Sequence, residues 1–305
     1  MNTQPNGVPE SALESQAVAP ATLSATRPLY WSIRRELWEN RSIYVAPLAA
    51  AVVVFFGFTV HALVRNHIRT APAPALDAAR QYTAIVMPYS MAATMIMVTA
   101  LVVGVFYCVD ALYSERRDRS VLFWKSLPVS DLTTVLTKAS IPLVVLPLVA
   151  FAAGVATQLA MLVLPVRMGA GMAWTAPPLL ELWFVMAYGL AVHALWHAPL
   201  YGWLLLVSSW ARRTPLLWAV LPPLALGVLE RIVFQTSHFA ALVRYRVAGA
   251  MTEAFDLESK GARFIRLTQL DPLGFLSSPG LWLGLIAAAL FLAVAVRLRR
   301  RGEPL

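Results

Sequence analysis

Two histidines four positions apart, His193 and His197, are the residue pair in this sequence that best fits a chemical site. This spacing places both side chains on one face of a helix. Zinc proteases of the HExxH type need a glutamate directly after the first histidine, whereas Ala194 follows His193 here. Two histidines without a nearby carboxylate make a poor metal site. We therefore expect no bound metal and a polar lining inside a helix bundle, with an intramembrane metallopeptidase as an alternative.

A second candidate is the adjacent acid–base pair Glu230 and Arg231, which follows a long apolar stretch. Such a pair could contact a substrate or move a proton, but an ionic pair at the level of the lipid headgroups is the simpler interpretation. Pro222 and Pro223 are expected to bend or break the helix that carries it. The possible intramembrane polar site therefore comprises His193, His197, Glu230 and Arg231.

Nucleotide hydrolysis is not expected in this chain. A Walker A loop requires a Gly-Lys step followed by Ser or Thr, and the sequence has no Gly-Lys dipeptide. We expect no catalytic residues and no cofactor here. Cys108 is the only cysteine, so the chain has no internal disulfide, and its thiol is expected to behave as a small apolar group.

The elements that must position these residues are membrane-spanning helices. The chain has 305 residues, of which 59% are hydrophobic and 13% charged, whereas soluble proteins carry roughly 25% charged residues. Only helices or closed barrels satisfy the backbone in lipid, and no strand-like alternation competes with the apolar runs. We predict an all-α membrane protein with six spans, at about residues 43–64, 82–109, 141–166, 182–208, 215–234 and 279–296.

The distribution of charge predicts the orientation. The loops on the same side as both chain ends hold more Lys and Arg than the loops on the other side, which places both termini in the cytoplasm. Cationic flanks facing anionic lipid headgroups account for the net charge of +9, and no nucleic-acid partner is implied. Residues 1–26 are predicted to be a disordered tail, and residues 27–305 a single transmembrane domain.

Three segments outside the spans carry further patterns. Residues 29–40 (LYWSIRRELWEN) predict an interfacial helix with Trp31 and Trp38 on one face, or an ordinary extension of the first span. In the charged connector, residues 110–138, Pro128 ends one helix and Ser130 or Asp131 caps the next. The connector could dock onto a soluble partner or could be a solvated loop that only enforces topology. The outer-side loop, residues 235–278, predicts short amphipathic or re-entrant helices before the last span.

The connector carries a recognisable motif. Glu115-Arg116, Ser120, the stretch LPVS at 127–130 and Lys138 follow one another between the second and third spans. With this motif and the six-span layout, the chain resembles the permease subunits of bacterial type-2 ABC exporters from about Tyr30 onward. That family has cytoplasmic termini, an interfacial helix before the first span and a cytoplasmic coupling helix after the second. The family's frequent Gly-Thr pair is Arg119-Ser120 here, which departs from the pattern.

The resemblance implies a mechanism and partners. Two permease chains, identical or different, would pair in the bacterial inner membrane, and separate ATPase subunits would bind ATP and Mg and receive the coupling helices. The expected contacts to the ATPase are Glu115, Arg116, Arg117, Asp118, Arg119, Phe123 and Trp124. Reversing the charges of Arg116 and Arg117 would then uncouple the ATPase while leaving the membrane fold intact.

Two alternatives to this assignment stay open. The stretch HALWHAPL resembles the histidine-containing helix of prenyl-protease-like membrane proteins, although their Glu-Glu-x-x-x-Arg element is absent from this sequence. The chain could also be a membrane assembly protein that transports nothing.

Overall fold

The computed structural model describes residues 26–68, 78–118, 130–167, 177–255 and 267–301. Within these ranges the chain is helical and forms no strand, so the predicted all-α class is confirmed. Six helical stretches are long and apolar enough to cross a membrane, which makes the chain a multi-pass membrane protein. They are α2 (Ser42–Ile68), α3 (Ala78–Ala111), the run α6 (Asp131–Ser140), η2 (Ile141–Val145) and α7 (Leu146–Arg167), then α8 (Leu179–Trp210), α9 (Pro215–Val233) and α13 (Pro279–Arg301).

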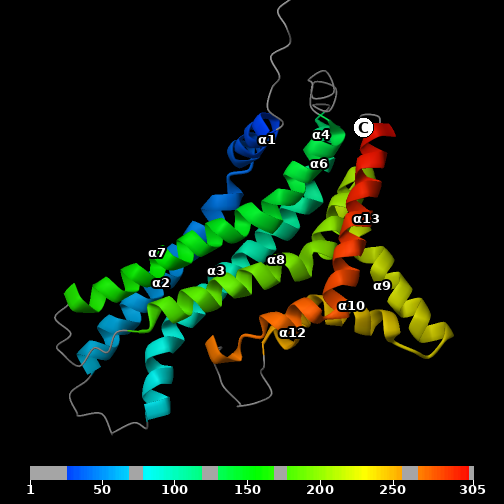
Figure 1. Cartoon of the computed structure of the whole chain (residues 1–305). Coiled ribbons are helices and arrows are strands. Elements are labelled where there is room, and N and C mark those ends of the chain that lie inside the picture. The colour runs from blue at the N-terminus through cyan, green and yellow to red at the C-terminus, as the bar shows by residue number, and fades with distance from the viewer. Residues whose placement is uncertain (1–25, 69–77, 119–129, 168–176, 256–266, 302–305) are drawn as a thin grey trace, which may run out of the picture.

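The helices α2, α3, α7 and α8 lie together as one bundle, and α13 packs along α8 (Figure 1). Their facing sides share an apolar core that includes Ile96, Leu146 and Leu205. The arrangement explains the sequence pattern, because helices surrounded by both lipid and other helices have no polar face to display. The hydrophobic runs therefore locate the spans but do not reveal which helices are neighbours.

Both ends of the described chain lie at one end of the bundle, which we call the terminus-bearing end (Figure 1). It holds the predicted interfacial helix as α1 (Thr26–Glu39), the short α4 (Tyr113–Arg117), the start of α6 and the last turn of α13. The short helices predicted for the outer-side loop are found near the start of α13. They are α10 (His238–Ala248), α11 (Ala250–Ala254), η3 (Leu267–Gln269) and α12 (Pro272–Ser277).

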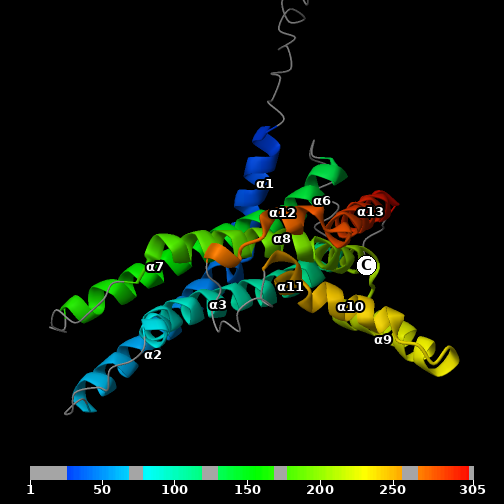
Figure 2. The same ribbon diagram turned by 60° about the horizontal axis from the view of Figure 1, so that its bottom comes forward.

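Helix α9 stands apart from the bundle (Figures 1 and 2). Only 6% of its apolar window is buried inside the chain, against 22–44% for the other five spans. The helix is also unbroken, contrary to one of the two outcomes predicted for Pro222 and Pro223. Pro223 cannot donate to the carbonyl of Ala219 four residues earlier, and the indole Nε1 of Trp203 donates to that carbonyl instead, at 3.1 Å.

Candidate functional site

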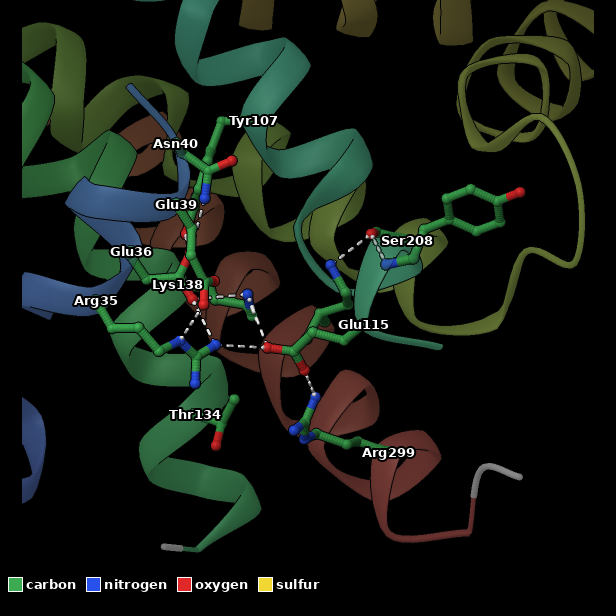
Figure 3. Close-up of polar contacts among 12 residues, drawn as sticks. Arg35, Glu36, Glu39, Asn40, Tyr107, Glu115, Thr134, Lys138, Ser208 and Arg299 are labelled. Atoms are coloured by element: carbon green, nitrogen blue, oxygen red, sulfur yellow. Dashed lines mark hydrogen bonds and ion pairs between the residues drawn. The ribbon is translucent and has the colours of Figure 1, made fainter. Parts of the chain in front are cut away.

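The terminus-bearing end contains a buried set of charged side chains from four elements (Figure 3). Glu36 on α1, Glu115 on α4, Lys138 on α6 and Arg299 on α13 are each less than 9% exposed. With two neighbours that bind them, they form the ionic cluster, which consists of Arg35, Glu36, Glu115, Asp131, Lys138 and Arg299. Charged side chains are almost never buried unless they are paired, so this cluster distinguishes the terminus-bearing end from the apolar bundle.

Lys138 lies at the centre of the ionic cluster. Its Nζ atom donates to Glu36 Oε1 at 2.8 Å and lies 3.0 Å from Glu115 Oε1. The side chain is only 3% exposed, so both bonds form out of contact with bulk water. One ammonium group therefore joins α1 to α4 through two carboxylates, and it does so from the last turn of α6, where a cation is favoured by the helix dipole.

The carboxylates of Glu36 and Glu115 also accept hydrogen bonds from other donors. Glu36 accepts from the hydroxyl of Tyr107 at 2.8 Å and from Nδ2 of Asn40 at 3.3 Å. Glu115 accepts from Nη2 of Arg35 at 3.2 Å and from Nη1 of Arg299. Each of the two buried carboxylates thus receives several donors, which offsets the cost of burying it.

Arg299 connects the two sides of the charged connector. Its Nη1 binds Glu115, which precedes the connector's central residues, and its Nε donates to Asp131 Oδ1 at 3.0 Å, which follows them. Ser130 caps α6 by accepting from the N–H of Thr133 at 3.0 Å, as the sequence predicted. The guanidinium group of Arg299 therefore holds together the point at which the connector leaves the bundle and the point at which it returns.

The local sequence of α1 explains why the carboxylate of Glu36 lies in this site. Ile33, Glu36 and Leu37 have the i, i+3, i+4 spacing of a single helix face, and Ile33 and Leu37 pack against the main core. The opposite face leaves Trp31 and Trp38 exposed, with the guanidinium of Arg34 5.2 Å and 4.7 Å from their ring centroids. One face of α1 thus packs against the bundle, and the aromatic face stays exposed.

The predicted coupling residues divide into three groups. Glu115 and Arg116 are buried, and Arg116 Nη2 donates to the carbonyls of Ser208 and Ala211 at 3.1 and 2.6 Å. Arg117 and Asp118 are exposed and form an ion pair with each other at 3.0 Å. The other three lie outside the described residues: Arg119, Phe123 and Trp124. Glu115 and Arg116 thus bind within the chain, so we assign them a positioning role.

Ser208 completes the attachment of α4 to α8. Its Oγ atom accepts from the backbone N–H groups of Leu112 and Tyr113, both at 2.9 Å. These N–H groups lie where α3 ends and α4 begins, and the end of a helix needs such partners for its free backbone groups. Together with Arg116, this serine fixes the start of the connector to the end of α8.

His193 and His197 bind neighbours inside the chain. His193 Nε2 lies 3.0 Å from the hydroxyl of Tyr201, and His197 lies within hydrogen-bond distance of the carbonyls of His193 (Nδ1, 3.0 Å) and Val247 (Nε2, 3.4 Å). Over the described residues, no group of three or more His, Cys, Asp or Glu side chains could hold a metal ion. These contacts fit the polar lining that the sequence predicted.

Glu230 has a different role from the predicted ionic pair. Its carboxylate accepts from the hydroxyl of Thr236 and from the N–H groups of His238 and Phe239 at 2.7–2.8 Å, so it caps the start of α10. No ion pair joins it to Arg231 in the described part of the chain, and that prediction is wrong. His197 binds the opposite end of α10, so the four predicted polar residues do not form one site.

The short helix α10 is attached to the bundle through Arg246. Its Nη2 donates to the carbonyl of Gly280 at 2.7 Å, and its guanidinium stacks 4.5 Å from the ring centroid of Trp196. The indole of Trp196 donates back to the carbonyl of Arg246 at 3.0 Å. Gly284 leaves the space that this guanidinium occupies, because an added Cβ there would lie 2.6–2.8 Å from its atoms.

Replacing Gly284 with alanine is expected to displace Arg246 and to lower the free energy of unfolding by about 1.5–3 kcal/mol, the typical contribution of a hydrogen bond to a charged group. Denaturant titration of the purified protein in mild detergent would measure it. Gly57→Ala is the matched control, because a Cβ at Gly57 meets nothing within 4 Å. An equal effect of both substitutions would show that Arg246 needs no space at Gly284.

The residues that sequence reasoning missed are the distant members of the ionic cluster. Glu36 and Arg299 were not predicted as site residues, and Asp131 was predicted only as a possible cap. The available signal was an acid between two inward-facing apolar residues on α1 and, on α13, a cation that shares a helix face with Ala295 and Val296. This signal identifies candidates for burial but not their partners.

Comparison of the chain with protein families, with curated proteins and with solved structures finds no match.

Proposed function

We propose that this chain is the permease subunit of an ATP-driven ABC exporter, with both termini in the bacterial cytoplasm and ATP hydrolysed by a separate subunit. The observation that carries the proposal is the ionic cluster, which holds both sides of the charged connector against α1 and α13. A loop whose charges served only to enforce topology would need no such buried attachment, because exposed charges suffice for that purpose.

The attachment suits the transfer of force. The connector begins with α4, which Arg116 and Ser208 bind to α8, and it ends within α6, which Lys138 and Asp131 bind to α1 and α13. A displacement of the connector is therefore applied to several spans at once. In the proposed mechanism, closure of the ATPase subunits moves the connector, and the bundle tilts because its attachment points are fixed to one another.

The same arrangement leaves two exposed surfaces for contact with partners. Arg117 and Asp118 are more than half exposed and are available to the ATPase subunit, together with Arg119, Phe123 and Trp124 in the proposed contact. The exposed apolar surface of α9 faces lipid or the second permease chain.

The proposal is tested by purifying the tagged chain from native membranes in mild detergent and identifying what co-purifies. We expect an ATPase subunit with a Walker A loop, and we expect Arg117→Glu to reduce its recovery at least about tenfold, equivalent to about 1.4 kcal/mol. Arg244→Glu is the matched control, because Arg244 is an exposed arginine on α10 near the other end of the bundle.

Two results would count against the proposal. One is the failure of any ATPase subunit to co-purify in several detergents. The other is equal recovery of the ATPase subunit from the Arg117→Glu and Arg244→Glu proteins. Stoichiometric zinc in a sample free of ATPase would instead favour the metallopeptidase alternative.

A further inference from the structure

The helix that begins with α6 and continues as α7 contains an irregular turn, η2, over Ile141–Val145. The N–H of Leu146 donates to the carbonyl of Ile141, five residues earlier, instead of the usual four. Such a π-helical turn accommodates one more residue than an α-helical turn, and it occurs frequently at functional sites. We call it the wide turn.

The local sequence accounts for the wide turn. Pro142 has no N–H, and its ring clashes with the carbonyl four residues earlier, that of Lys138, in a regular helix. The hydroxyl of Ser140 also donates to the carbonyl of Thr137 at 2.6 Å, which adds a side-chain bond to the last turn of α6. The hydrogen-bond ladder is therefore altered directly after Lys138.

The position of the wide turn gives it mechanical significance. On one side, α6 carries Lys138 and Asp131, which bind Glu36, Glu115 and Arg299 in the ionic cluster. On the other side, α7 continues into the membrane bundle, and Ile141 and Pro142 at the junction are buried. The wide turn is thus the segment that joins the ionic cluster to this span.

We propose that the wide turn is a rotary joint between the connector and the third span. If the five residues close into α-helical turns, α6 turns by about 100° about its own axis and shifts by about 1.5 Å relative to α7, the geometry of one residue. This rotation carries Lys138 and Asp131 away from their partners. The ionic bonds and the open turn therefore occur together, and release of the bonds accompanies closure of the turn.

The two arrangements form a discrete switch. A one-residue change of helical register has no stable intermediate position, and packed interfaces likewise change between distinct states. Pro142 opposes the closed turn, so the open turn is the resting state and work on the connector is needed to close it. The joint deepens the proposed function, because it converts a movement of the connector into a rotation of α6. The geometry of the joint itself does not depend on what moves the connector.

Two variants of Pro142 test the joint in opposite directions. Deleting Pro142 removes the extra residue, so the chain forms a regular helix that keeps α6 in its present orientation and leaves no second register. Pro142→Ala keeps the length and removes the clash, so the turn can close. Each is combined with Lys138→Met, which removes the central cation of the ionic cluster. Asp131→Asn, at a partly exposed carboxylate, replaces Lys138→Met if that protein does not fold.

The readout is the distance between spin labels on cysteines introduced at Leu136 of α6 and Leu290 of α13, both of which are exposed, while Cys108 is fully buried. With Pro142→Ala and Lys138→Met we expect the distance to shift by roughly 5–10 Å, the scale of a helix diameter. With the Pro142 deletion and Lys138→Met we expect no shift. A shift in the deletion protein, or none in the alanine protein, would overturn the joint.

Coupling is measured separately on the purified complex with its ATPase subunit. The Pro142 deletion should retain the bound ATPase but lose the ATP-dependent change in the distance between the labels at Leu136 and Leu290. If no ATPase binds even the unmodified chain, the proposed function fails while the label distances still decide the joint. If the ATPase binds and the deletion protein keeps this ATP-dependent change in distance, the joint plays no part in coupling.

Discussion

Replacing Lys138 with methionine is expected to lower the free energy of unfolding by about 3–5 kcal/mol, the cost of removing one partner from a buried charged pair. The substitution leaves Glu36 and Glu115 buried, each 6% exposed or less, without the ammonium group that lies between them. Methionine is similar in length and apolar, so the loss comes from the missing charge and not from a cavity. Denaturant titration in mild detergent measures the effect.

The control for this prediction is Arg300→Met, because Arg300 is exposed and directly follows the cluster residue Arg299. We expect a change of less than about 0.5 kcal/mol there. Adding Glu36→Gln to the Lys138→Met protein should recover part of the lost stability, since it removes one of the two carboxylates that lose the ammonium group. If Lys138→Met is as stable as Arg300→Met, the ionic cluster does not hold the terminus-bearing end together.

Reversing the charge of Arg116 is expected to have a comparable effect on stability, also about 3–5 kcal/mol. Its guanidinium donates to two backbone carbonyls, and a glutamate in that place would bury an unpaired carboxylate against them. This expectation replaces the earlier one, drawn from the sequence, that a joint reversal of Arg116 and Arg117 would leave the membrane fold intact. The yield of monodisperse protein and its melting temperature are the measurements.

The adjacent Arg117 gives the matched comparison, because its side chain is 56% exposed. Arg117→Glu should change the free energy of unfolding by no more than about 0.5 kcal/mol. The two reversals thus separate a positioning residue from a contact residue at neighbouring positions. If Arg116→Glu folds as well as Arg117→Glu, the hydrogen bonds to Ser208 and Ala211 contribute little.

The spans could be predicted from the sequence because the bilayer imposes a local requirement. About twenty apolar residues in a row are needed wherever a helix crosses the membrane, and the six predicted segments coincide with six helices. The cap at Ser130 and the helix at α1 were predictable for the same reason, since each depends on a few consecutive residues.

The ionic cluster could not be predicted because its bonds join residues far apart in the chain. Glu36 and Lys138 are 102 positions apart, and Glu115 and Arg299 are 184 apart. Which charges meet depends on which helices are neighbours, and apolar spans of similar composition do not specify their neighbours. The family resemblance predicted that Glu115 and Arg116 contact a partner protein. In the structure both residues are buried and bind within the chain.

Because its members lie far apart in the sequence, the ionic cluster can be completed only late in the synthesis of the chain. Arg299 is made after every other member, so Glu115 and Asp131 lack this partner until the last helix has emerged from the ribosome and joined the bundle. Domains form progressively during synthesis, and a chain that stops before α13 would keep these acids without their arginine. Chains that include α13 therefore complete the ionic cluster, and membrane proteases should remove chains that stop before α13 faster.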